Sequence, residues 1–174
     1  DTLQMRLAYR GLFDALNGDT VLFKTQPAEK FLSERVSAVR KAKEEKLKKA
    51  GKDFLEENAK KEGVVTLPSG LQYKVLKQGN GAVAKVNDKV TVLYEGRLID
   101  GKVFDSTEKH GGEPATFSPS QVIKGWTEAL CMMPVGSKWQ LYIPQELAYG
   151  ARGAGSDIPA YSTLVFDVEV LSIG

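Results

Sequence analysis

The sequence predicts an α+β fold, in which a twisted antiparallel β-sheet wraps around one short helix and an all-α N-terminal region with a long linker helix precedes it. The composition changes near Gly63: residues 1–62 hold 5 of the 15 aromatic residues and dense charge, whereas residues 70–174 hold the other 10. Apolar residues recur every three or four positions before Gly63 and every two positions after it. We therefore expect two domains, a helical region over 1–62 and a β-rich domain over 63–174.

Two helices are expected in the first domain. The first is amphipathic, ends at Asn17-Gly18, and has an apolar stripe made of Met5, Ala8, Tyr9, Leu12, Phe13 and Leu16. The second begins near Pro27, which the first turn of a helix tolerates, and nothing interrupts it before Gly63. It would have about 36 residues and a length of roughly 54 Å. Its residues 40–49 read as a solvated charge run.

The apolar faces of these helices cannot close a core between themselves. The side chains that need cover are Leu12, Phe13, Leu16, Phe31 and Val36. We expect a second copy of the chain to cover them, giving a homodimer through residues 1 to about 40. Packing of the same faces on the C-terminal domain is the alternative.

The second domain reads as strands around one helix. The segments "LQYKVLKQG" and "KVTVLYEGRLIDGKVFDS" are predicted strands, with a hairpin turn at Asp100-Gly101. In "SKWQLYIP" the side chains of Trp139, Leu141 and Ile143 should face the core, and those of Lys138, Gln140 and Tyr142 should face away from it. The last strand, "STLVFDVEVLSI", alternates in the same way. Only residues 121–131 fit a regular helix.

Several classes of function are excluded by composition. The formal charge is +2, from 24 basic and 22 acidic residues, and no basic cluster is interleaved with aromatic residues, so nucleic acid is not an expected partner. The single cysteine, Cys131, cannot form an intrachain disulfide and reads as a small buried hydrophobe. The single histidine, His110, excludes a histidine cluster for zinc. The segment "GARGAG" lacks the ending of a phosphate-binding loop and reads as a surface loop. No nucleophile, metal or cofactor is expected.

Aromatic residues that lie next to turns are the candidate site. They occur in "LYEG", "KVFDS", "ATFS", "IKGW" and "LAYG". Such residues would line an apolar pocket with few polar groups. In "VIKGWTEAL" a glycine and a tryptophan stand in the first turn of the predicted helix, an unfavourable start that something outside the helix must require.

These segments closely resemble the FKBP-type peptidyl-prolyl cis/trans isomerases. The resemblance rests on "VTVLYEGRLIDGKVFDST", "VIKGW", "VGSKWQLYIPQELAYGARG" and "IPAYSTLVFDVEVLSI", and it covers about residues 64–174. The N-terminal half, with "DALNGD" and "AKKEGVVTLPSGLQYKVL", resembles more loosely the macrophage infectivity potentiator and FkpA branch. The resemblance implies an FKBP-like fold, proline-containing polypeptide clients and no cofactor. It also implies homodimers joined by N-terminal helices, chaperone activity, and the periplasm or cell envelope of a Gram-negative bacterium, with outer-membrane association and a signal segment outside this chain.

The resemblance also assigns roles to residues of this chain. Trp126 would form the floor of the pocket, and its walls would be Tyr94, Phe104, Phe117, Val122, Ile123 and Phe166, with Ile158 on the loop beyond. The Tyr149 hydroxyl and the Ile123 N–H would donate hydrogen bonds to substrate carbonyls, and Asp105 would accept one from a ligand hydroxyl. Macrolides of the tacrolimus and rapamycin type would occupy the same pocket.

Rotation about an X-Pro bond breaks no covalent bond, which agrees with the lack of a nucleophile. Two other functions stay open at this point. One is a non-catalytic chaperone or binding module for unfolded or proline-containing segments, and the other is a hydrolase that uses His110. We also predict that Asp157, near the rim, disfavours acidic residues before the proline.

Overall fold

The computed structural model describes residues 25–174. The helix predicted over residues 5–16, its stop at residues 17–18 and most of the predicted dimerisation region lie outside the described residues. Within residues 25–174 no helix has the length and apolarity needed to cross a membrane.

The helices and strands are α2 (Thr25–Asn58), β1 (Val64–Thr66), β2 (Gln72–Lys77), β3 (Val90–Leu98), β4 (Val103–Ser106), β5 (Ala115–Phe117), α3 (Lys124–Leu130), β6 (Lys138–Ile143) and β7 (Leu164–Ile173). Four short 3-10 helices lie in the connections: η1 (Glu108–His110), η2 (Pro119–Gln121), η3 (Gln145–Leu147) and η4 (Gly150–Arg152).

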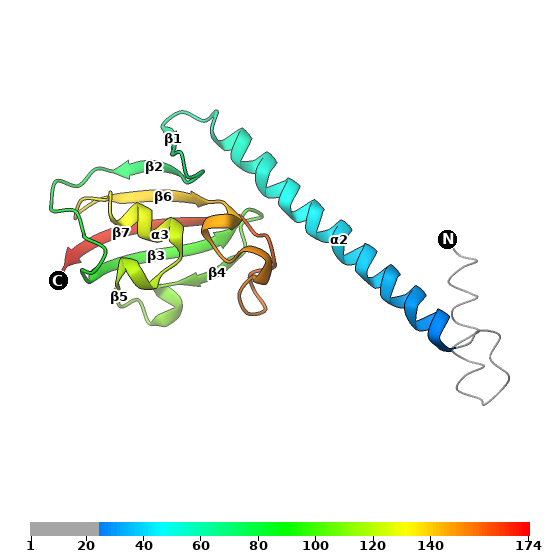
Figure 1. The fold of residues 1–174 in the computed structure, drawn as a ribbon. Helices are drawn as coiled ribbons and strands as arrows, with labels where there is room; N and C mark the ends of the chain where they lie inside the picture. Colours follow the sequence, from blue (N-terminus) through cyan, green and yellow to red (C-terminus); the bar gives the residue numbers. More distant parts are fainter. Residues whose placement is uncertain (1–24) are drawn as a thin grey trace. The chain divides into compact units, whose positions relative to one another are not determined.

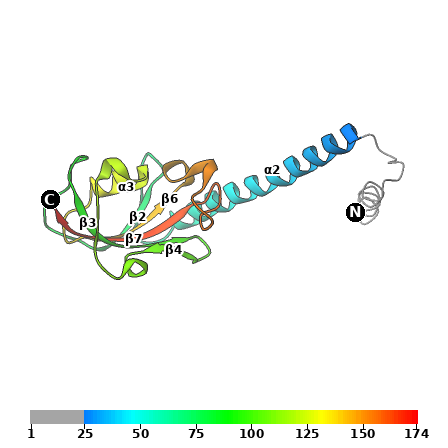
Figure 2. The same ribbon diagram turned by 90° about the horizontal axis from the view of Figure 1, so that it is seen from below.

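The strands form one antiparallel sheet in the order β1-β2-β6-β7-β3-β4. The short strand β5 also pairs with β3. The long strands β3 and β7 pair along their whole length, from Val90 with Ile173 to Leu98 with Leu164. Helix α3 lies against one face of this sheet (Figures 1 and 2). The predicted α+β class and the predicted wrapping of a sheet around one short helix are confirmed.

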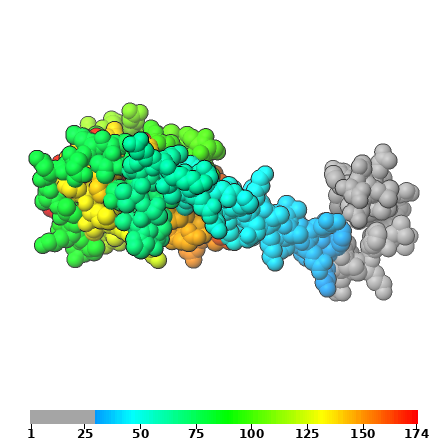
Figure 3. Space-filling view, turned by 90° about the horizontal axis from the view of Figure 1, so that it is seen from above, coloured from blue at the N-terminus to red at the C-terminus, as the bar shows by residue number. Residues whose placement is uncertain are grey.

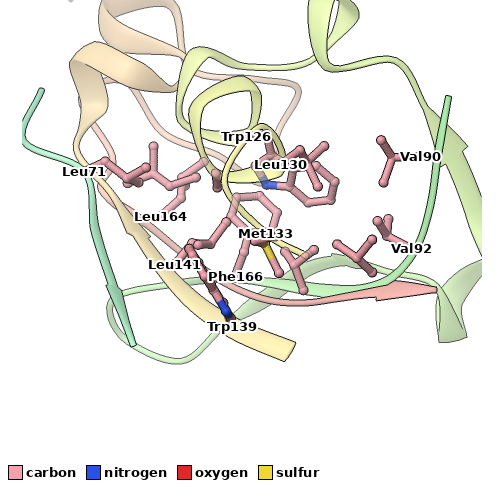
Figure 4. Close-up of a cluster of buried hydrophobic side chains, with 14 of the residues drawn as sticks. Leu71, Val90, Val92, Trp126, Leu130, Met133, Trp139, Leu141, Leu164 and Phe166 are labelled. Atoms are coloured by element: carbon pink, nitrogen blue, oxygen red, sulfur yellow. The ribbon is translucent and has the colours of Figure 1, made fainter. Parts of the chain in front are cut away.

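The core fills the space between α3 and the sheet (Figure 4). Period-two alternation places one side of each central strand in this space, as the sequence predicts. The side chains that are buried there include Val90, Val92, Leu130, Met133, Leu141, Ile143, Leu164 and Val168. The hairpin turn at Asp100-Gly101 is also confirmed, because the Gly101 N–H donates to the Leu98 carbonyl and Gly101 has a φ of 90°.

The opposite face of the sheet differs from the prediction. Tyr142 points away from the main core, as the alternation predicts, but it is only 6% exposed, so this face is covered as well. The last turns of α2 cover it: the rings of Phe54 and Tyr142 lie 6.1 Å apart, and the Asn58 Nδ2 donates to the Gln72 Oε1 at 3.0 Å. Gly51 is buried in the same stretch, where a Cβ would collide with the Thr163 side chain. Figure 3 shows the surface that this end of α2 forms together with β1 and β2.

Two predicted helix boundaries also change. Helix α2 ends at Asn58 rather than near Gly63, since the Asn58 side chain is buried against Gln72 and the chain turns there. The helix predicted over residues 121–131 is shorter. The chain is extended at Val122 and Ile123, and α3 begins only at Lys124.

The chain divides into two compact units, residues 1–43 and residues 44–174. The packing boundary therefore falls inside α2, whereas the composition changes near Gly63. In the described part of the first unit, the side chains of Phe31, Leu32, Val36 and Val39 are 52 to 69% exposed. No residue of the charge run over 40–49 is buried, but Leu47 and Lys48 are half-buried and the Lys48 Nζ lies 4.4 Å from the centroid of the Tyr161 ring, so the run is solvated only in part.

Candidate active site

A cavity of about 500 Å³ opens between α3, the sheet and the loops that follow β5 and β6. Aromatic and aliphatic side chains make up most of its wall. The lining residues are Tyr94, Phe104, Asp105, Phe117, Gln121, Val122, Ile123, Trp126, Tyr149 and Phe166. A concave, mainly apolar site with a few polar groups is what a small ligand or a single side chain of a polypeptide needs.

Trp126 is held by three aromatic rings. Its ring centroid lies 5.4 Å from that of Tyr94, 5.6 Å from that of Phe117 and 5.3 Å from that of Phe166, with interplanar angles of 82 to 88°. Edge-to-face contacts of this kind are favourable because the positive ring edge meets the negative ring face. Phe104 extends the cluster through a similar contact with Phe166, at 5.5 Å. The tryptophan is 4% exposed, so the cavity has a rigid floor.

The unusual sequence at the start of α3 has a structural reason. Gly125 is buried against β6, where a Cβ would lie 2.5 Å from the Ile143 Cγ2, so only glycine lets the helix approach the sheet this closely. The extended backbone before α3 turns Val122 and Ile123 into the cavity wall. The Ile123 carbonyl caps the helix by accepting from the Trp126 and Thr127 N–H groups, while its own N–H has no acceptor among the described residues.

Asp105 is the acidic group of the cavity. Its Oδ2 accepts a hydrogen bond from the Tyr94 hydroxyl at 2.7 Å, and its Oδ1 accepts from the Ser106 N–H at 3.0 Å. The His110 Nε2 lies 2.8 Å from the same Oδ1. Partial burial by itself would raise the pKa of Asp105, but the bonds from Tyr94 and His110, the charge on His110 and the Ser106 N–H together hold it below its ordinary value. Asp105 is therefore a carboxylate near neutral pH.

Two tyrosines of the cavity stay protonated. Burial, and then the nearby Asp105, raise the pKa of Tyr149 above its ordinary value. Burial and the hydrogen bond to Asp105 raise the pKa of Tyr94. The Tyr94 hydroxyl is used by Asp105, whereas the Tyr149 hydroxyl has no hydrogen-bond partner within residues 25–174. Tyr149 is thus a free donor at the cavity mouth.

The structure brings together nine of the ten residues that the sequence predicted for the site. The tenth, Ile158, is 7% exposed and packs in the hydrophobic core, and it is not among the lining residues. Gln121 lines the cavity and was missed, because a polar residue next to a predicted helix start gives no signal of its own. The contact of His110 with Asp105 was also missed. No group of three or more potential metal ligands gathers among the described residues.

Two family models match the chain. One, described as FKBP-type peptidyl-prolyl cis-trans isomerase, matches residues 81–171, and the other, described as the domain amino terminal to that isomerase, matches residues 1–75. The chain belongs to the FKBP-type peptidyl-prolyl cis-trans isomerase family. It is an isomerase of X-Pro peptide bonds, as the resemblance of its motifs indicated.

Two similar proteins match nearly the whole chain. The FKBP-type 22 kDa peptidyl-prolyl cis-trans isomerase of Escherichia coli is 52% identical over 94% of this chain and 80% of that protein. The outer membrane protein MIP of Legionella longbeachae is 45% identical over 94% of this chain and 73% of that protein. Both branches named from the N-terminal motifs, Mip and FkpA, occur among the relatives.

Solved FKBP structures have the same fold. The crystal structure of FkpA from Escherichia coli matches with a TM-score of 0.77 at 41% identity, covering 99% of this chain and 82% of FkpA. A peptidyl-prolyl cis-trans isomerase from Pseudomonas syringae matches with a TM-score of 0.70 at 41% identity, covering 75% of this chain and 95% of that one. The predicted FKBP-like fold is therefore confirmed.

Proposed function

We propose that the cavity above Trp126 binds the proline of a polypeptide client and lowers the barrier to rotation about the preceding peptide bond. One observation carries this assignment: the buried Trp126 ring, in edge-to-face contact with Tyr94, Phe117 and Phe166, lines a cavity that has few polar groups. A proline ring is apolar and nearly flat, so such a floor can hold it by stacking and exclusion of water.

The cavity supports rotation without a covalent step. The barrier of about 20 kcal/mol arises because the planar amide keeps double-bond character in its C–N bond. A twisted amide has lost this resonance and carries less charge on its oxygen, so a dry, apolar site favours it over the planar form. A thousandfold acceleration requires roughly 4 kcal/mol of such preference.

Three polar groups would orient the client. Within residues 25–174 the Tyr149 hydroxyl and the Ile123 N–H donate no hydrogen bond, so each can donate to a client carbonyl. Asp105 can accept from a ligand hydroxyl or N–H, and Tyr94 holds its carboxylate in place. Ile158 would act only indirectly, by packing beneath the loop that carries it.

Site variants test this assignment. Exchange between cis and trans forms of a short X-Pro peptide can be measured by NMR without a coupling protease. We expect Tyr149→Phe to lower kcat/KM by about tenfold, as for the loss of one hydrogen bond in a dry site. Adding Trp126→Leu should remove measurable activity in a chain with an unchanged circular dichroism spectrum. Tyr161→Phe, a tyrosine that does not line the cavity, is the matched control. Full activity of the folded double variant would refute the assignment.

Macrolides of the rapamycin and tacrolimus type should bind in the same cavity. A bulky apolar ligand with carbonyl groups would use the Trp126 floor and the two free donors. We expect rapamycin to inhibit the unmodified chain competitively and to bind the Trp126→Leu variant at least tenfold more weakly, by calorimetry. Non-competitive inhibition would place the macrolide elsewhere.

A homodimer through residues 1 to about 40 is the second part of the proposal. Phe31, Leu32, Val36 and Val39 form one exposed apolar stripe on α2, and large exposed apolar patches mark interaction sites. The partner favoured here is a second copy of the chain, with client polypeptides as the alternative. Sedimentation velocity should give a dimer for the unmodified chain and a monomer for a Phe31→Ser, Val36→Ser double variant. A monomer in both samples would reject the dimer.

Chaperone activity and a place in the cell envelope complete the proposal. The name of one relative, outer membrane protein MIP, supports a location in the envelope of a Gram-negative bacterium, which cell fractionation would test.

Chaperone activity is tested by measuring how far the chain prevents the aggregation of an unfolded client. If the Tyr149→Phe, Trp126→Leu variant still prevents aggregation, holding does not depend on the isomerase cavity. If the unmodified chain holds clients but shows no isomerase activity, it is the non-catalytic binding module instead.

A further inference from the structure

The single histidine of the chain contacts Asp105, the one acidic side chain that lines the cavity among the described residues. The His110 Nε2 lies 2.8 Å from the Asp105 Oδ1, and the other oxygen of that carboxylate accepts from the Tyr94 hydroxyl. His110 itself does not line the cavity; it ends the short helix η1, and its side chain is 65% exposed. It therefore acts on the cavity only through Asp105.

The surroundings of this pair hold few other groups that change charge near neutral pH. On η1, Lys109 is engaged elsewhere, since its Nζ donates to the Val103 and Phe104 carbonyls of β4. Glu108, on the same element, has no hydrogen bond or ion pair with His110 in the described structure. From β3 and from the loop after β6, the groups that face Asp105 are the hydroxyls of Tyr94 and Tyr149, whose raised pKa values keep them neutral.

Asp105 also keeps its charge over this range, because its pKa lies below the ordinary value for an aspartate. Histidine is the side chain type whose charge changes between about pH 5 and 8. His110 is the histidine that contacts Asp105.

We propose that His110 is a positioning residue for the isomerase reaction, which holds the Asp105 carboxylate and whose charge makes catalysis depend on pH between about 5 and 8. The proposal deepens the site assignment given above and rests on it. The charged imidazolium neutralises part of the carboxylate and binds it more tightly, since hydrogen bonds between charged groups are shorter and stronger.

The sign of the effect follows from the client. The client carbonyl oxygens, which carry partial negative charge, must enter a cavity whose only acidic side chain is Asp105. When His110 loses its charge, the carboxylate is less compensated and less firmly held, and both changes disfavour the bound transition state. We therefore expect kcat/KM to fall as the pH rises from 5.5 to 8, by about two- to fivefold, the range that an exposed ion pair supports.

Three variants test the proposal by NMR exchange, with a blocked X-Pro peptide that has no titratable group. His110→Arg keeps a positive charge at every pH, so its kcat/KM should stay near the low-pH value of the unmodified chain from pH 5.5 to 8. His110→Gln keeps a donor without charge, so its kcat/KM should stay near the high-pH value. Glu113→Gln removes a charge from the same loop without touching Asp105, and it should keep the pH profile of the unmodified chain.

The outcomes distinguish a failure of the role proposed for His110 from a failure of the site assignment. A flat profile in the unmodified chain, or the same slope in His110→Gln as in the unmodified chain, would overturn the role of His110 while leaving the site assignment intact. If the Tyr149→Phe, Trp126→Leu variant isomerised the peptide as fast as the unmodified chain does, the site assignment itself would be wrong. A slope that disappears in His110→Gln and in His110→Arg but persists in Glu113→Gln supports the proposal.

Discussion

The floor and the rim of the cavity are built in different ways. The floor is Trp126, which is 4% exposed and fixed by ring contacts from three segments of the sheet. At the rim stands Asp105, whose side chain is 40% exposed, and behind it His110, which contacts Asp105 from outside the cavity and is 65% exposed. Buried contacts act through packing, and exposed charges act through fields that water and salt weaken. Changes at the floor should therefore lower stability and abolish activity, whereas changes at the rim should alter kcat/KM only a few-fold.

The largest effect is expected at the floor. Trp126→Ala removes a buried indole and its three ring contacts, so the free energy of unfolding should fall by about 3 to 5 kcal/mol. Urea denaturation followed by circular dichroism measures this loss. Leu76→Ala, at a site that is 48% exposed on β2, is the control and should change the value by less than about 0.5 kcal/mol. Equal losses in both variants would mean that Trp126 contributes no more to stability than an exposed side chain does.

Beneath the floor, Gly125→Ala sets two effects against each other. Alanine has a higher helix propensity, which alone would stabilise the chain by up to about 1 kcal/mol. Its Cβ would collide with Ile143, and overpacking of this kind costs about 1 to 3 kcal/mol. We expect net destabilisation in urea, with the exposed Lys124→Ala on the same helix as control. A gain in stability would mean that α3 can move away from β6 at little cost.

At the rim, Asp105→Asn should lower the free energy of unfolding at pH 7 by less than about 1 kcal/mol, because the carboxylate is partly exposed. The pKa of Asp105 is lowered in the folded chain, so its contribution is present above its ordinary value of 3.8 and is lost as the pH falls below it. Urea denaturation of both chains at pH 7 and pH 3 should show the difference shrinking in acid. A difference that grows in acid would contradict the direction of this pKa shift.

The smallest effect is expected at Asp157. The sequence predicted that this residue disfavours acidic residues before the proline, but its Oδ1 is 3.0 Å from the Lys102 Nζ and it does not line the cavity. Asp157→Ala should therefore change the ratio of kcat/KM for Glu-Pro and Leu-Pro peptides by less than about twofold. Lys102→Ala should shift the ratio against the Glu-Pro peptide. If neither variant moves the ratio, Asp157 has no part in specificity.

The sequence could predict the floor because its residues are placed by local pattern and family motif. Alternation along β3 and β7 directs Tyr94 and Phe166 towards α3, and the motif around Trp126 marks the start of that helix. The rim depends on which loops meet in space. Nothing in the spacing of His110 and Asp105, five residues apart across the end of a strand, indicates that their side chains touch.

The same limit explains the other differences. Alternation correctly separates Leu141 from Tyr142, but it does not say whether a second element covers the far face of the sheet. A helical pattern likewise places Phe54 and Phe31 on apolar stripes of α2 without saying which stripe packs on the chain's own sheet. Periodicity predicts which side chains share a face, but it does not predict which element packs against that face.

The attachment of the last turns of α2 has a consequence for the smallest piece of this chain that can fold alone. A fragment that begins at Gly63, where the composition changes, would lack Phe54 and Asn58 and would open Tyr142 and Gln72 to water. A fragment that begins near Glu44 keeps these contacts. For this isomerase domain, the fragment boundary should follow packing rather than composition, and the fifteen helical residues 44–58 belong to the autonomous folding unit.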